Sequence, residues 1–127
     1  MQEIAIIGAG DLGGATAHAL ARCDVARVIT LVDERGRVAA GKALDIAQAA
    51  PIEGFATQLT GSADIARTAG AEVVVIADQS GAGEWTGDEA LALLRRLSLM
   101  ARHAVVVCAG AATLRMATTG GPSPRTS

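Results

Sequence analysis

The sequence predicts an α/β fold, a parallel sheet covered by helices on both faces, and three observations predict it. Short runs rich in Val and Ile alternate with segments of helical spacing, which is typical of βαβ units. Half of the residues are hydrophobic and only 2% are aromatic, so the core has to consist of Ala, Val, Ile and Leu, which suit closely packed α/β layers. A glycine-rich segment separates the first predicted strand from the first helix.

Five strands are predicted, because five short β-branched runs are bounded by turn-forming residues. They are Glu3–Ile7, Arg27–Val32, Ala56–Thr60, Glu72–Ala77 and Ala104–Cys108. The first helix is expected over about Asp11–Cys23 and the second over about Arg35–Ala49. Pro51 is expected to end the second helix, because its ring cannot continue the hydrogen-bond ladder.

A third helix is expected between the last two strands. Thr86 and Glu89, three residues apart, match a capping box that opens this helix, which then runs to about Arg102. Its buried stripe is predicted to consist of Leu91, Leu94 and Leu97.

The length of 127 residues is that of one domain. We assign it to residues 1–112, and residues 113–127 are expected to form a disordered tail, because Gly120–Ser127 offers nothing to bury. Any two-domain enzyme of this fold would therefore be incomplete in this chain, which we interpret as truncated relative to such an enzyme.

Charge and hydropathy exclude two classes of partner. The net charge is -2 and Arg95-Arg96 is the longest basic run, so nucleic acid is not expected. The longest apolar segments are far shorter than the roughly 20 residues that span a bilayer, so no membrane segment is expected.

Without a leader at the N-terminus, the chain is predicted to be cytoplasmic. Cys23 and Cys108 are therefore interpreted as inert core thiols.

The glycine-rich segment Gly8–Gly13 matches the pattern G-x-G-x-x-G between a strand and a helix. Gly8 would allow the tight turn, Gly10 would leave room for a pyrophosphate, and Gly13 would let the helix pack closely on the strand. The amides of Asp11 and Leu12, at the start of the helix, would point toward the phosphate. The pattern in this context predicts a Rossmann-type, doubly wound parallel sheet with a dinucleotide site.

Asp33 stands twenty residues after Gly13, at the end of the second predicted strand. Its carboxylate would accept both ribose hydroxyls of NAD and repel the 2′-phosphate of NADP, although Arg35 would soften that choice. The alternative is that the glycine-rich turn and the acid have only a structural role and bind no dinucleotide.

The first three fifths of the chain resemble the N-terminal domain of malate dehydrogenases of the lactate/malate dehydrogenase family. The segments that carry this resemblance are Gly8–Gly14, Leu31–Asp33, Gly41–Asp45, Ala50–Phe55 and Gly70–Ile76. The resemblance implies that Gly8, Gly10, Asp11, Leu12, Gly13 and Asp33 contact NAD. It also implies that the helix around Gly41 to Ala49 packs against a second copy in a homodimer, the alternative being an ordinary sheet-covering helix.

The chain departs from the family's pattern where the substrate would bind. The family carries two arginines in a loop after the fourth strand, but here no Arg or Lys lies between Arg67 and Arg95. Asp78, Glu84 and Asp88 would repel a dicarboxylate. The family's Asn-Pro turn after the fifth strand is also missing, because the chain contains no Asn.

No catalytic residue or metal site is predicted. The family's catalytic His belongs to a second domain, and His18 and His103 are interpreted as structural, the latter at the wrong end of the sheet. Trp85 is interpreted as a local packing residue instead of a lid. Asp78 and Gln79 would add charge and bulk beside the pyrophosphate, so binding of NAD is expected to be weak.

Three hypotheses remain at this point. The first is an NAD(H)-binding module without dehydrogenase activity by itself. The second is part of an NAD-dependent malate dehydrogenase, an oxidoreductase, completed by another chain. The third is an interaction protein that keeps the fold and binds no dinucleotide.

Overall fold

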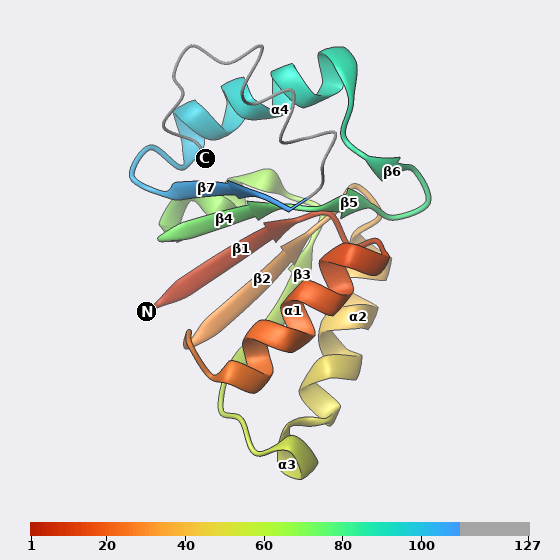
Figure 1. The fold of residues 1–127 in the computed structure, drawn as a ribbon, viewed down its shortest axis with the longest axis vertical. Coiled ribbons are helices and arrows are strands. Elements are labelled where there is room, and N and C mark those ends of the chain that lie inside the picture. Colours follow the sequence, from red (N-terminus) through yellow and green to blue (C-terminus); the bar gives the residue numbers. More distant parts are fainter. Residues whose placement is uncertain (110–127) are drawn as a thin grey trace.

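A computed structural model of the protein describes residues 1–109 and contains a sheet of five parallel strands (Figure 1). In sheet order these strands are β3 (Gln58–Ser62), β2 (Val28–Val32), β1 (Glu3–Ile7), β4 (Val73–Ile76) and β7 (Val105–Cys108). The chain first moves outward from β1 to β3 and then crosses back to the other side of β1, which defines the doubly wound arrangement. The predicted fold class is confirmed.

Helices cover both faces of this sheet. They are α1 (Asp11–Cys23), α2 (Gly36–Gln48), the short α3 (Ala50–Glu53), the 3-10 helix η1 (Ile65–Gly70) and α4 (Gly87–Met100). In Figure 1, α1 and α2 lie side by side on one face and α4 lies on the opposite face. Among the described residues, no helix is long and apolar enough to cross a membrane.

The core consists of two apolar clusters separated by the sheet. Ile4 and Ile6 of β1 point into the cluster beneath α1 and α2, whereas Ala5 and Ile7 point into the cluster beneath α4 and η1. Side chains alternate between the two faces of a strand, so a strand that is apolar at every position has to be covered on both sides. The central position of β1 follows from that pattern.

The helices lie close to the sheet because small side chains face it. Gly13, Ala17 and Ala21 are the buried positions of α1, four residues apart along one side. On the other side of the same layer, a Cβ added to Gly61 of β3 would overlap the backbone at Ala39 of α2. The alanine-rich composition thus sets short distances between helices and strands.

The third strand was predicted two residues too early, since β3 begins at Gln58 instead of Ala56. The carboxylate of Asp24, which ends α1, accepts a hydrogen bond from the Ala56 amide at 3.1 Å. The hydroxyl of Thr57 donates to the Ala26 carbonyl at 2.7 Å. These two residues are therefore held by the loop after α1 and are not available to the sheet.

The prediction for α4 was wrong in two details. Thr86 is the residue before the helix, but its side chain makes no capping hydrogen bond. The φ of Gly87 is +60°, so the helix starts in a left-handed conformation that moves the Thr86 hydroxyl away from the first amides. The helix ends at Met100 instead of Arg102.

The buried stripe of α4 consists of Ala90, Leu93 and Leu97, so only the last of the three predicted leucines is fully buried. A uniform spacing of three residues winds around a helix, whereas steps of three and then four stay on one face. Leu94 is half-buried against the same cluster.

Three smaller expectations also need correction or limits. Pro51 was expected to end the second helix, but α2 already ends at Gln48. Pro51 instead lies in the first turn of α3, where a missing amide costs nothing. Both cysteines are free, as predicted, but Cys23 is exposed and is not a core residue. The proposed tail at 113–127 and the domain end at residue 112 lie outside the described residues.

Candidate functional site

The glycine-rich turn joins β1 to α1 at the carboxyl end of the sheet. Gly8 has a φ of +111°, which favours glycine, and its amide donates to the Val32 carbonyl at 2.7 Å. A Cβ on Gly13 would overlap the Gly8 carbonyl oxygen. The turn therefore has the tight shape and the close helix packing that the sequence predicts.

The first turn of α1 is capped by a side chain from far along the chain. Its N-cap residue, Gly10, provides no side chain. Instead, the carboxylate of Asp78 accepts hydrogen bonds from the Leu12 amide at 3.0 Å and from the Gly13 amide at 2.7 Å. The carbonyl of Asp78 accepts a further bond from the Gly10 amide at 3.0 Å. Amides at a helix start favour an anion, and here that anion is Asp78.

Asp78 belongs to a small hairpin that the sequence did not predict. Its strands, β5 (Asp78–Gln79) and β6 (Gly83–Glu84), pair in antiparallel orientation. In Figure 1 this hairpin lies beside the start of α1. Gly81, with a φ of +76°, occupies the third position of the connecting turn, and the Ala82 amide donates to the Gln79 carbonyl at 3.3 Å. These are the features of a type II turn.

Asp33, the predicted ribose acid, lies directly after β2 and is only 6% exposed. Its Oδ2 accepts hydrogen bonds from the amides of Ala9 and Ser80, both at 2.8 Å. Its Oδ1 accepts a bond from the Arg35 amide at 2.9 Å. Asp33 thus joins the glycine-rich turn to the hairpin through the backbone of both.

Lys42 is a site residue that sequence reasoning missed. It is the single lysine of the chain, and its Nζ donates to the Gly10 carbonyl at 2.9 Å from α2. An amphipathic helix offered no reason to single it out, because its position is set by the packing of α2 against α1. It brings a positive charge to the turn where a phosphate is expected.

The predicted site residues therefore gather around one turn. Gly8, Gly10, Leu12, Gly13 and Asp33 take part in its hydrogen bonds or its close contacts. Asp11 lies in the first turn of α1 and is exposed. Asp78 lies beside Gly10, since a Cβ on Gly10 would overlap the Asp78 carboxylate; that a pyrophosphate would lie there stays a prediction.

Backbone amides at a helix start are the kind of hydrogen-bond donor that binds the phosphates of a dinucleotide. Two amides at the start of α1 already hold an anionic oxygen pair at hydrogen-bond distance. Gly10 leaves the space above them free of any side chain of its own. The position itself is taken by Asp78, so a phosphate would reach these amides only after the carboxylate leaves.

The two histidines lie away from this turn. His18 is in α1 and its Nε2 lies 2.5 Å from a carboxylate oxygen of Glu53 in α3. His103 precedes β7, at the amino end of the sheet, and is exposed. Trp85 packs against the cluster beneath α4, which agrees with a packing role. Within residues 1–109, no cluster of three metal-ligating side chains occurs.

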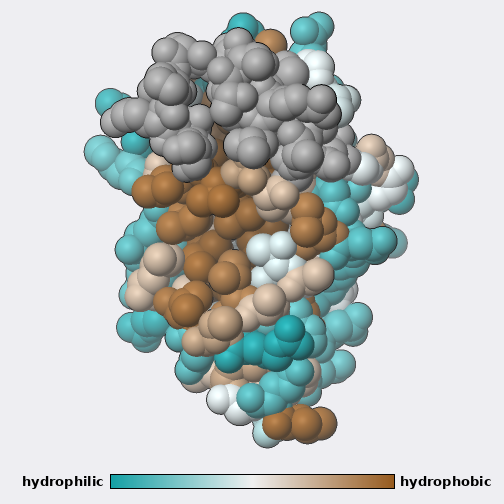
Figure 2. Space-filling view, viewed as in Figure 1, coloured by the Kyte–Doolittle hydropathy of each residue, from teal (hydrophilic) through white to brown (hydrophobic). Residues whose placement is uncertain are grey.

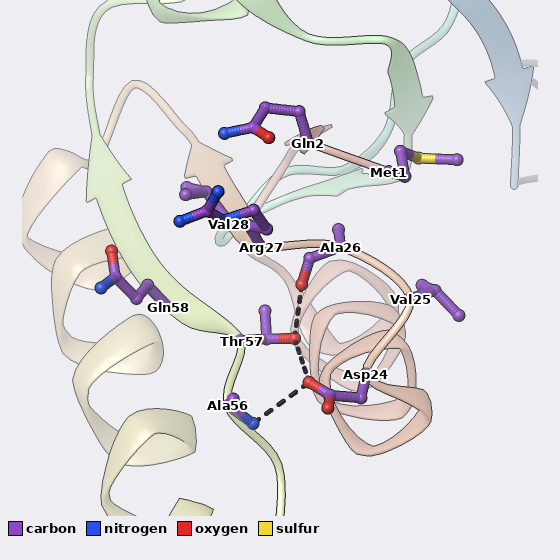
Figure 3. A pocket seen from close by; sticks show the side chains of 10 residues that line it. All are labelled: Met1, Gln2, Asp24, Val25, Ala26, Arg27, Val28, Ala56, Thr57 and Gln58. Carbon is purple, nitrogen blue, oxygen red and sulfur yellow. Dashed lines mark hydrogen bonds between the residues drawn. The ribbon is translucent and has the colours of Figure 1, made fainter.

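A surface pocket of about 470 Å³ lies at the opposite end of the sheet (Figure 3). It is lined by the amino ends of β1 and β2, by the loop after α1, and by the approach to β3. Figure 3 shows the Ala56 amide and the Thr57 hydroxyl each directed at the Asp24 carboxylate within it. Ligands of open α/β sheets bind at the carboxyl ends of strands, so we assign no dinucleotide to this pocket.

The fold and the site together define a dinucleotide-binding Rossmann domain. Comparison with known proteins narrows this class. The model of the lactate/malate dehydrogenase NAD-binding domain matches residues 2–114, and this chain belongs to that family. The sequence-based prediction of the family, and of NAD as the cofactor that this family's domain binds, is thereby confirmed.

Both malate and lactate dehydrogenases are among the individual matches. The malate dehydrogenase of Thioalkalivibrio sulfidiphilus is 51% identical over 76 residues, which are 60% of this chain and 25% of that protein. The solved malate dehydrogenase of Salinibacter ruber has a TM-score of 0.77 and 24% identity, covering 97% of this chain and 42% of its own. A malate dehydrogenase of Plasmodium falciparum in complex with NADH has a TM-score of 0.70 and 23% identity over 85% and 35%.

These structural matches support the fold, because their identity lies below 25%. The chain spans about a quarter of the length of the curated relative.

Proposed function

We propose that this chain binds NAD(H) at the glycine-rich turn and transfers no hydride by itself. The observation that carries the proposal is the pair of amides at the start of α1, which hold an anion next to a glycine that leaves room for it. The chemistry that NAD supplies when bound is the acceptance or donation of a hydride.

The residues of this chain would bind and orient the cofactor. The amides of Leu12 and Gly13 would donate to phosphate oxygens, and the positive end of α1 would favour their charge. Gly8 and Gly10 would bring the backbone close to the pyrophosphate, with Asp11 at its exposed edge. Asp33 would accept the ribose hydroxyls once the Ser80 amide no longer occupies its Oδ2.

NAD is proposed in preference to NADP. Asp33 is buried and negatively charged at the position where a 2′-phosphate would enter, and repulsion between like charges is strong where water is excluded. Arg35 contributes its amide to Asp33, and its guanidinium lies against Gly81 of the hairpin. It therefore points toward the hairpin while the hairpin is closed.

The proposed lack of dehydrogenase activity rests on the segment after β4. A guanidinium that clamps a carboxylate has no substitute among acids, and this stretch contains Asp78 and Asp88 but no Arg or Lys. The test is malate oxidation followed by NADH absorbance at high protein concentration. We expect no turnover above the buffer, and measurable turnover that scales with protein would contradict the proposal.

Binding is tested by titrating the purified chain with NAD, NADH and NADP in a calorimeter. Saturable binding of NAD and NADH, with NADP weaker, is expected. Gly10→Val should abolish it, because the side chain fills the phosphate position. Gly70→Ala, whose Cβ would meet only Oε1 of Glu3 at an ordinary 3.5 Å before the start of β4, serves as the control. Absence of binding at millimolar NAD would contradict the proposal.

Two alternatives have supporting observations of their own. The high identity to a malate dehydrogenase over the first part of the chain favours part of such an enzyme, completed by another chain. The occupation of the α1 amides by Asp78 favours an interaction protein that binds no dinucleotide. Addition of a partner chain that restores turnover would support the first, and a complete lack of nucleotide binding would support the second.

A homodimer through the helix around Gly41 to Ala49 is part of the proposal. Leu44 on α2 is 58% exposed, and Ile52 on the adjoining α3 is 90% exposed. A second copy that packs on α2 would cover both of these apolar side chains. Light scattering should give twice the chain mass, and Leu44→Asp should give a monomer.

A further inference from the structure

We propose that the β5–β6 hairpin is an autoinhibitory latch, in which Asp78 takes the place of a dinucleotide phosphate until the hairpin moves away. This inference rests on the proposed binding of NAD at the glycine-rich turn. It adds that the chain exists mainly in a closed form, and that binding requires the hairpin to open.

The first contact that keeps the hairpin closed is made by the carboxylate of Asp78. Both of its oxygens accept backbone hydrogen bonds at the start of α1, from Leu12 at 3.0 Å and from Gly13 at 2.7 Å. The contact joins residues that are 65 and 66 positions apart, so it is made by the folded hairpin and not by the local turn. A carboxylate and a phosphate offer the same acceptor oxygens to these amides.

The second such contact is made by the backbone of Ser80. Its amide donates to Oδ2 of Asp33 at 2.8 Å, the same oxygen that accepts the Ala9 amide. Together with the Arg35 amide on Oδ1, these bonds use three of the roughly four acceptor positions of a carboxylate that is only 6% exposed. One short hairpin thus engages both halves of the dinucleotide fingerprint, the phosphate donors and the ribose acceptor.

The geometry makes the closed hairpin and the bound dinucleotide mutually exclusive. The space next to Gly10 that has to receive a phosphate contains the Asp78 carboxylate. The apparent affinity for NAD is therefore the affinity of the open form multiplied by the fraction of molecules that are open. Gly81 and Gly83 both have a φ of +76°, and glycines at the turn allow the backbone rotation that opening needs.

The single tryptophan of the chain provides a readout of opening. Trp85 follows β6 directly and is half-buried against the cluster beneath α4. Movement of the hairpin changes its surroundings, so titration with oxidised NAD should shift its fluorescence emission along with binding. Saturable binding without any change in emission would overturn the latch.

The central experiment compares Asp78→Ala with the natural sequence by calorimetry and thermal unfolding. Removal of the carboxylate should strengthen NAD binding about tenfold, the size of a lost helix cap expressed as an equilibrium. The same variant should unfold at a lower temperature without NAD, because the start of α1 loses its cap. A residue with a purely structural role would lower the melting temperature and leave affinity equal or weaker.

Two further variants keep the comparison sharp. Ser80→Pro removes the amide that bonds Asp33, and its ring would overlap Oδ2 of Asp33 while the hairpin is closed. Proline is favoured at the second position of a type II turn, so the turn itself should tolerate it and the variant should favour the open form. It should strengthen NAD binding about threefold, roughly the share of one hydrogen bond. Asp88→Asn removes one negative charge from the exposed first turn of α4 and should leave the affinity unchanged.

The outcomes separate this inference from the proposed function. Equal affinity of the natural chain, Asp78→Ala and Ser80→Pro would overturn the latch and leave NAD binding in place. An absence of NAD binding in all three would overturn both. Stronger binding in the two hairpin variants, with Asp88→Asn unchanged, is the result that the latch requires.

Discussion

Alanine substitutions at Gly13 and Gly14, two adjacent glycines of α1, should change the stability of the fold in opposite directions. Both positions are helical, so each substitution gains about 1 kcal/mol of helix propensity. A Cβ on Gly13 would overlap the Gly8 carbonyl oxygen, which belongs to the backbone of the turn and cannot rotate away. A Cβ on Gly14 would lie 3.3 Å from Cδ of Lys42, the middle of a flexible side chain.

The expected magnitudes follow from these contacts. Overpacking against backbone costs about 3 kcal/mol at the upper end of the usual range, so Gly13→Ala should lose about 2 kcal/mol after its propensity gain. Gly14→Ala should gain about 0.5–1 kcal/mol. With a urea m-value of about 2 kcal/mol/M for a domain of this size, the midpoint of Gly13→Ala should fall by about 1 M.

The assay is urea unfolding at constant temperature, followed by far-ultraviolet circular dichroism. Equal slopes for the variants would show that only the native state has changed. If Gly13→Ala is as stable as the natural chain, α1 does not approach the turn as closely as described. If both variants lose stability equally, the loss does not come from the contact with Gly8.

The remaining predictions concern the core, the thiol and the turn. Leu97→Ala should destabilise the fold by about 2–5 kcal/mol because this side chain is 1% exposed, whereas Leu99→Ala, at 78% exposed, should stay within about 0.5 kcal/mol in the same melts. Burial raises the pKa of the Cys108 thiol, so with the other cysteine replaced by serine its alkylation, measured by mass spectrometry, should be slower at pH 8 than that of a free thiol and accelerate as the pH rises, because the thiolate is the nucleophile; a rate equal to that of a free thiol at pH 8 would contradict the burial. Lys42→Met should weaken NAD binding several-fold and reduce its salt dependence in calorimetry, since the charge beside the Gly10 carbonyl is lost; an unchanged affinity would exclude Lys42 from the site.

The local part of the site could be predicted from the sequence. The turn at Gly8 to Gly13 is contiguous, and its requirements for space and positive φ fall on residues whose identity reveals them. Asp33 was found because the distance from the turn to the end of the next strand is set by one helix and one strand.

The long-range part of the site could not be predicted in full. The charge of Asp78 beside the phosphate position was an expectation, but its two hydrogen bonds to α1 depend on a hairpin that has no β-branched residues and whose two strands are two residues each. Lys42 lies in an amphipathic helix where a lysine is ordinary, and only the packing of α2 against α1 brings it to Gly10.

The errors in the fold also have local causes. Thr57, before β3, is β-favouring, yet hydrogen bonds from Ala56 to Asp24 and from Thr57 to Ala26 tie this segment to the loop after α1. Thr86 and Glu89 have the residue types and spacing of a capping box, but Thr86 forms no capping hydrogen bond, because the φ of Gly87 is positive. Patterns therefore located the elements, whereas tertiary contacts set their ends.

The outer strand β7 has a practical consequence for handling the protein. Val105 and Val107 are 62% and 42% exposed on the face that also carries α1, and Figure 2 shows an apolar stretch of surface in this view. Among residues 1–109, no further strand pairs with the outer side of β7. An edge of this kind can serve as a template for another chain. Association through β7 would grow with protein concentration, so binding constants should be compared only at matched, low protein concentration.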